Sequence, residues 1–201
     1  MEYLVLGFFT GLSLILAIGA QNIFVIEQGL KKQHIFLVCF LCSISDLILI
    51  FLGIFLFHYF IQYFNNTIEL IFNILLVIFL IHFIYSKIKL LNSKVNFNET
   101  QDYTEFNVFL KTLGFTYLNP HVYSDTVFFL GNFSKNFILH QKILFGAGAS
   151  VASFIFFFAI GYLSKNLSKY AKSEKVWKVI NIFIVSFMTI LTLFIISEMI
   201  R

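Results

Sequence analysis

The chain carries six apolar segments, each about as long as the hydrocarbon core of a bilayer, and two of them contain polar interruptions. A helix needs about 20 predominantly apolar residues to cross that core. Of the 201 residues, 59% are hydrophobic and only 12% are charged, which is far from the composition of soluble domains. We therefore predict an all-α integral membrane protein whose six transmembrane helices lie at about 3–26, 35–57, 67–86, 107–133, 143–164 and 178–200.

The first segment is interrupted by the sequence Gly19-Ala20-Gln21-Asn22. In lipid every peptide group must find a partner inside the protein, so such a break is tolerated only where protein or a wet cavity faces it. Transporters use breaks of this kind as binding sites. We expect a mature transmembrane helix here, because the segment has no basic leader and no small-residue cleavage site. Gly19, Gln21 and Asn22 are therefore predicted to bind substrate.

A second interruption, Asn119-Pro120-His121, follows about one hundred residues later, and it contains the one proline of the chain. Proline inside a helix removes a hydrogen bond and crowds the preceding turn, so the fourth segment is expected to kink here. An ordinary structural kink is one interpretation. The coincidence with Asn119, His121 and the nearby Asp125 favours a second substrate-binding break in which Asn119, Pro120 and His121 take part.

A polar stretch from Ser86 to Asn107 divides the six segments into two groups of three. Because three is an odd number, the second group must enter the membrane upside down relative to the first. The sequence therefore predicts one transmembrane domain, 1–201, built as a 3+3 inverted repeat with broken helices 1 and 4. Repeat 1 covers about 1–88, the link about 89–106, and repeat 2 about 107–201.

Basic residues mark the orientation of the helices, because cytoplasmic connections carry an excess of lysine and arginine. The first, third and fifth connections are rich in lysine, whereas the other side holds only Lys135, Lys142 and Arg201. This pattern places both termini outside and the polar link in the cytoplasm. A five-crossing topology, with a cytoplasmic N-terminus and one re-entrant segment, is the alternative.

Asp46 and Asp125 lie within the second and fourth segments. An aspartate near the bilayer centre costs about 2.5–3.5 kcal/mol on insertion scales and usually faces the bundle interior or a water path. No lysine or arginine occurs at comparable depth in these segments. Both acids could be protonated and bonded to Ser43, Ser45, Ser124 or Thr126. The interpretation we favour is a mobile positive partner, which is a proton, a metal cation or a cationic substrate.

Cys39 and Cys42 lie three residues apart in the second segment. One alternative function is that of a membrane oxidoreductase, which would use such a pair near a membrane surface together with a redox partner. Another is that of a purely structural protein, which would explain neither the amides nor the aspartates. Free cysteines are among the most buried residues, so we interpret this pair as small apolar side chains of the core.

The sequence also suggests roles for two polar residues and for three glycines. Glu27 and Gln28, at the end of the first segment, are expected to be solvated, with a gate as the alternative. Gly7, Gly11 and Gly146 are expected to form faces where helices approach closely.

These segments resemble the signature segments of the LysE-type exporters of lysine and arginine. The likeness covers essentially the whole chain and is carried by Gly11–Ser13, Ala17–Val25, Gln28–Leu30, Ser45–Asp46 and Phe115–Thr126. The related homoserine and threonine exporters typically carry Pro-Gly-Pro at the first break. Ile18-Gly19-Ala20 stands in that place here, which favours the branch that carries basic amino acids.

The resemblance implies export of L-lysine, L-arginine or both from the bacterial cytoplasm across the inner membrane, driven by the membrane potential or the proton gradient. It implies a transporter and no enzyme, with no cofactor and no nucleic acid as partner. Asp46 and Asp125 would then alternate between the substrate and protons. Export of neutral amino acids is one alternative. Export of a divalent metal cation is another, since His121 and Asp125 are four residues apart and would lie on one helix face. A homo-oligomer is compatible with the sequence.

Overall fold

The computed structural model describes residues 1–201 except 17–18, 64–65, 93–103, 120–121, 170–173 and 201. The described residues are helical and contain no strand, which confirms the all-α prediction. The helices are α1 (Glu2–Ile15), α2 (Ala20–Lys31), α3 (Ile35–Tyr63), α4 (Asn66–Asn92), α5 (Glu105–Tyr117), the π-helix η1 (Tyr123–Phe129), α7 (Leu130–Phe133), α8 (Leu139–Leu167) and α9 (Glu174–Ile200).

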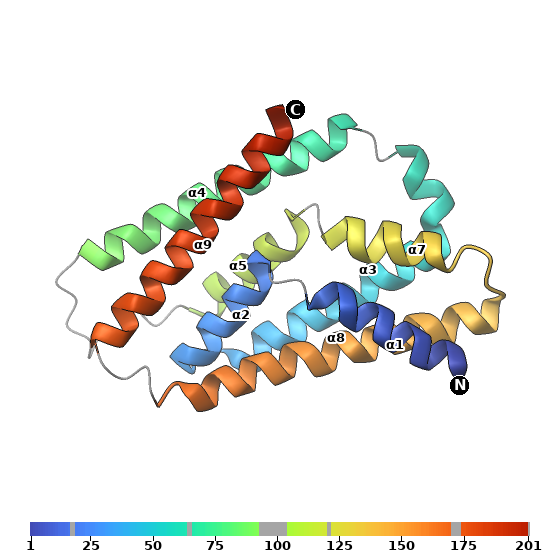
Figure 1. The fold of residues 1–201 in the computed structure, drawn as a ribbon, viewed down its shortest axis with the longest axis horizontal. Helices are drawn as coiled ribbons and strands as arrows, with labels where there is room; N and C mark the ends of the chain where they lie inside the picture. The colour runs from blue at the N-terminus through green and yellow to red at the C-terminus, as the bar shows by residue number, and fades with distance from the viewer. Residues whose placement is uncertain (17–18, 64–65, 93–103, 120–121, 170–173, 201) are drawn as a thin grey trace.

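Two long helices, α3 and α8, pack against each other and organise the rest of the molecule (Figure 1). Helices α1 and α2 both lie along α8, while α5, η1 and α7 lie along α3. Helices α4 and α9 pack side by side on one flank of the molecule, as Figure 1 shows. The buried core between these layers is mainly apolar and includes Phe24, Leu80, Phe115 and Met188.

Length and composition mark three described stretches as candidate membrane spans: Ile35–Phe57, Leu139–Leu167 and Lys178–Ser197. The pair α1 and α2 makes a fourth if it is one bent span. The described apolar part of α4, Asn73–Tyr85, is shorter than a span, and the predicted fourth segment is divided among α5, η1 and α7. Large apolar side chains such as Ile78, Leu163 and Ile190 are at least 60% exposed, as expected where lipid covers the surface. The protein is therefore a multi-pass membrane protein.

Glycines let these helices approach closely. A Cβ atom added to Gly7 would lie 2.0 Å from the backbone oxygen of Phe145, and one added to Gly148 would lie 2.0 Å from the backbone oxygen of Leu4. Gly11 would meet Ala149 at 2.8 Å. The prediction of close packing is thus confirmed for α1 and α8, whose backbones touch where no side chain intervenes.

Gly148→Ala should destabilise the protein, because the added methyl group meets backbone atoms of α1 that cannot move aside. Overpacking of this kind costs roughly 1–3 kcal/mol, so we expect a lower thermal unfolding midpoint of the purified protein in detergent. Gly146→Ala is the matched control on the same helix, because its methyl group meets only the side-chain ends of Ile54 and Phe51, at 2.9 Å. Equal midpoints for the two variants would contradict the packing described here.

Candidate functional site

The two interruptions predicted from the sequence meet at one cavity of about 270 Å³. Six of the predicted site residues line it: Gly19, Gln21, Asn22, Asp46, Asn119 and Asp125. Pro120 and His121 lie outside the described residues. The apolar part of the lining comes from helices of both halves of the chain and includes Leu14, Ile50, Leu130, Phe157, Leu191 and Ile195.

The first break separates α1 from α2, which are bent by 83° relative to each other. Gly19 caps α2 with extended backbone (φ −115°, ψ −177°), and the first turn of α2 that follows is buried. The side-chain amide nitrogen (Nδ2) of Asn22 donates to the backbone carbonyl oxygen of Ile15 at 3.1 Å, across the break. That bond satisfies one of the carbonyl groups left open at the end of α1. The N-terminal, electropositive end of α2 lies at the cavity, where it favours an anionic group.

The second break separates α5 from the π-helix η1. The hydroxyl group of Tyr123 donates to the carbonyl oxygen of Tyr117 at 2.9 Å, so a side chain bridges this break as well. Within η1 the hydroxyl of Thr126 donates to the carbonyl oxygen of Val122. Short π-helical turns are frequent at functional sites because they displace side chains from the regular helical register. Here the π-helix carries Asp125, which lines the cavity.

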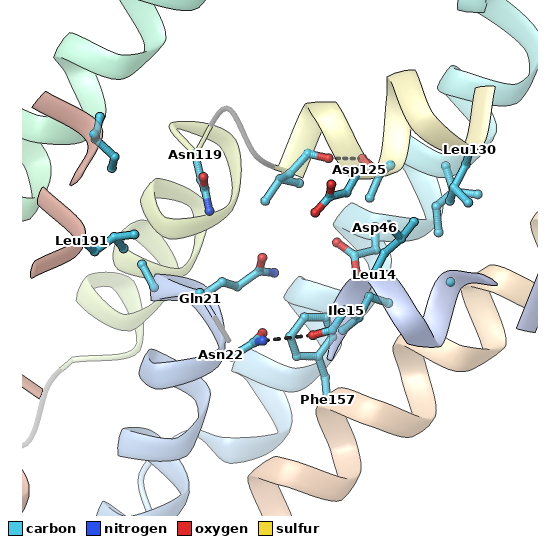
Figure 2. A pocket seen from close by; sticks show the side chains of 17 residues that line it. Leu14, Ile15, Gln21, Asn22, Asp46, Asn119, Asp125, Leu130, Phe157 and Leu191 are labelled. Atoms are coloured by element: carbon cyan, nitrogen blue, oxygen red, sulfur yellow. Dashed lines mark hydrogen bonds between the residues drawn. The ribbon is translucent and has the colours of Figure 1, made fainter. Parts of the chain in front are cut away.

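Asp46 approaches the cavity from the middle of α3 and is 3% exposed. Its Oδ2 atom accepts a hydrogen bond of 2.8 Å from the hydroxyl of Ser153 on α8. Figure 2 shows Asp46, Asp125 and Gln21 extending toward the same space from three different helices. Asp46 and Asp125 are the ionisable side chains in the described lining, and both are acidic.

The described hydrogen bond to Asp46 comes from none of the serine and threonine hydroxyl groups considered from the sequence. Ser43 Oγ is buried and has no hydrogen-bond partner among the described atoms, and Thr126 donates to its own helix. The side chain of Ser124 lies outside the described residues. The partner of Asp46 is Ser153, 107 positions away, and nothing in the local sequence around Asp46 signals it.

The two cysteines are buried, as predicted, with exposures of 0% for Cys39 and 1% for Cys42. The thiol of Cys39 donates to the carbonyl oxygen of Phe157 at 3.2 Å. Within the described part of the chain, no group of three or more His, Cys, Asp and Glu residues is placed to hold a metal ion.

The expectation that Glu27 and Gln28 are solvated is wrong. Their exposures are 1% and 0% on a helix, α2, that packs against α8, α3 and α5. Glu27 Oε1 lies 2.5 Å from Lys31 Nζ, one helical turn further along. A buried carboxylate requires such a partner, since leaving it unpaired in an apolar interior costs several kcal/mol.

Sequence comparison decides the family. The profile of the LysE type translocators matches residues 12–199, almost the whole chain. The chain belongs to the LysE-type translocator family. Members of this family are transporters and not enzymes, so the oxidoreductase interpretation of the cysteine pair is set aside.

Proteins named as arginine exporters are among the relatives of this LysE-type translocator. It is 32% identical over 181 residues to the arginine exporter protein ArgO of Pectobacterium carotovorum, an alignment that covers 89% of this chain and 88% of the relative. It is 30% identical over 186 residues to ArgO of Salmonella typhimurium, with 92% of this chain and 88% of the relative covered. No solved structure matches the chain.

The LysE-type translocator should lose stability when Ser153 is replaced by Ala, because the Asp46 carboxyl group then loses its buried donor. Leaving a buried acceptor unsatisfied costs roughly 1–3 kcal/mol, so the thermal unfolding midpoint in detergent should fall. Ser197→Ala is the matched control, since the hydroxyl of Ser197 is exposed and donates only to Phe194 on its own helix. A Ser153→Ala midpoint as high as that of the parent protein would contradict this role.

Proposed function

We propose that this LysE-type translocator exports basic L-amino acids, L-lysine or L-arginine, from the bacterial cytoplasm across the inner membrane in exchange for protons. The observation that carries the proposal is the cavity between two helix breaks whose described ionisable lining residues, Asp46 and Asp125, are both acidic. The relatives named as arginine exporters support the same substrate class.

We infer a six-span architecture in which 1–88 and 107–201 form inverted repeats joined by a cytoplasmic link. Each half contributes one interrupted helical segment followed by two long helices, α3 and α4 in the first half and α8 and α9 in the second. The helices that would correspond also pack together, α3 with α8 and α4 with α9, as expected around a two-fold axis. The lysine-rich connections support an orientation in which the end of α2 and the start of α5 lie at the cytoplasmic side.

The cavity suits the charges of a basic amino acid. Its carboxylate would lie at the N-terminal end of α2, near the amides of Gln21 and Asn22. Its two positive groups would lie near Asp46 and Asp125. A volume of about 270 Å³ is just below the roughly 300–1,000 Å³ typical of ligand pockets, which favours a single amino acid over a larger cargo.

Electrostatics explains why export needs a coupled ion. Moving one positive charge outward against an inside-negative potential costs about 2.3 kcal/mol per 100 mV. A uniporter for a cationic amino acid would therefore accumulate it inside the cell. Exchange for an incoming proton removes this cost, and a carboxyl group that binds either the substrate or a proton provides the coupling.

Asp46→Asn and Asp125→Asn should each abolish proton-driven efflux of labelled arginine or lysine from reconstituted vesicles. The amide keeps the size of the side chain but can neither carry the negative charge nor bind a proton reversibly. Glu2→Gln is the matched control, because Glu2 is an exposed acid in the first turn of α1. Undiminished, still proton-dependent transport in both aspartate variants would refute the mechanism.

Counterflow should identify the cargo and the coupled ion together. In vesicles that hold a pH-sensitive dye, arginine or lysine movement should be accompanied by proton movement in the opposite direction, because each acidic site carries one partner at a time. Threonine at the same concentration should neither compete nor move protons, since it lacks the second positive group. Preferential transport of threonine would replace the proposed substrate class with a neutral one.

A further inference from the structure

Two successive layers of side chains lie between α2 and α5 from the cavity toward the end of α2. These helices contact each other and run in opposite directions (Figure 1). On α2, Gln21 at the cavity is followed at helical spacing by Phe24 and then by Glu27 and Gln28. On α5, Lys111 precedes Phe115 by one turn, and Asn119 at the cavity follows. Residues of matching depth thus face a common seam.

The layer next to the cavity is aromatic. The rings of Phe24 and Phe115 are 4.9 Å apart between centroids, and their side chains are 2% and 0% exposed. Phe79 and Phe83 of α4 also pack against the ring of Phe115, with centroid distances of 4.8 and 5.0 Å. Rings packed in this way would block an amino acid that moves between the cavity and the end of α2.

The outer layer is ionic. Glu27 is buried and paired with Lys31 of its own helix. The half-buried Lys111 of α5 is attracted by Glu27 and repelled by Lys31. Water screens such interactions little at low exposure. The Glu27 carboxylate therefore holds two lysine side chains together at the depth where the basic cargo would have to pass.

The two sides of α2 are built differently. Toward α8 the helix is held by backbone contact, since a Cβ atom on Gly29 would lie 2.5 Å from the backbone oxygen of Gly161. Toward α5 it presents Phe24 and Glu27. The side-chain amide of Gln28 is 0% exposed, and neither its nitrogen nor its oxygen has a hydrogen-bond partner among the described atoms. An unsatisfied buried amide destabilises this closed arrangement and favours a second one that admits water.

We propose that the Phe24–Phe115 layer and the Glu27–Lys31–Lys111 cluster form the cytoplasmic gate of this translocator, and that α5 moves away from the pair α2 and α8 to open it. The assignment of this gate to the cytoplasmic side rests on the proposed transport function and orientation. The structure then represents the state in which the cavity is closed to the cytoplasm. The basic cargo, on its way in, would take the place of the Lys111 ammonium beside Glu27.

The gate can be tested by thiol access, which requires no transport. In a Cys39→Ala, Cys42→Ala background, Leu14→Cys places one thiol in the cavity lining. In inside-out vesicles a membrane-impermeant maleimide should label it slowly, because the gate is closed. Glu27→Gln should raise the labelling rate about tenfold, because Lys31 and Lys111 then repel each other without the carboxylate, and the open state of such an equilibrium is commonly populated at roughly 0.1–10% and has room to grow. Glu27→Asp, which keeps the charge, should leave the rate near that of the parent.

Further variants fix the sign of the effect. Phe115→Leu should also raise the labelling rate, whereas Gln28→Met should lower it by removing the unsatisfied amide from the closed state. Lys135→Met and Phe129→Ala are the matched controls, because both residues are exposed and lie far along the chain from the seam. Lys111→Met added to Glu27→Gln should bring the rate back toward that of the parent, because it removes the repulsion between Lys111 and Lys31.

The outcomes separate the gate from the cargo. Labelling that responds as described while vesicles fail to export arginine or lysine would support the gate and overturn the substrate assignment. Active export together with labelling rates that are the same in parent, Glu27→Gln and Phe115→Leu proteins would overturn the gate and leave the assignment standing. Variants with a thermal unfolding midpoint like that of the parent report on gating and not on loss of fold.

Discussion

The need to satisfy backbone polar groups inside an apolar molecule governs the centre of this protein. Each broken helix exposes carbonyl groups that a continuous helix would pair. Asn22 bridges the first break by donating to Ile15, and Tyr123 bridges the second by donating to Tyr117. A side chain therefore holds each break together, while the first turn of α2 and the π-helix η1 remain directed at the cavity. The interrupted backbone at the two breaks thus also forms part of the cavity wall.

Close backbone packing fixes which groups share that cavity. Glycine contacts hold α1 and α2 to α8, and Gly53 lets the backbone of α3 approach η1, where a Cβ atom would lie 2.6 Å from Val127. Since α3 and α8 also pack together, Asp46 and Ser153 come within hydrogen-bonding distance, and Asp125 lies at the same cavity. The acidic site thus depends on small residues that include Gly53, which lies outside the cavity lining.

One interpretation from the sequence was wrong for a physical reason. Glu27 and Gln28 look like solvated residues at a helix end, yet both are buried where α2 packs against α8, α3 and α5. In the same way, the hydroxyl group that donates to Asp46 belongs to Ser153 of α8, far away in the sequence. Periodicity within a segment predicts which residues share one face of a helix. It does not predict which other helix covers that face, because that helix comes from a distant part of the chain.

The sequence by itself determined the helical membrane class, the two breaks and the acidic residues within apolar segments, because bilayer thickness and the cost of polar groups in lipid act on local composition. Only the tertiary structure decided that the breaks face one cavity, that Ser153 serves Asp46, and that Glu27 lies buried beside Lys31 and near Lys111. These relations join residues far apart in the chain. They follow from how closely helices pack, which depends on the shapes of both surfaces at once.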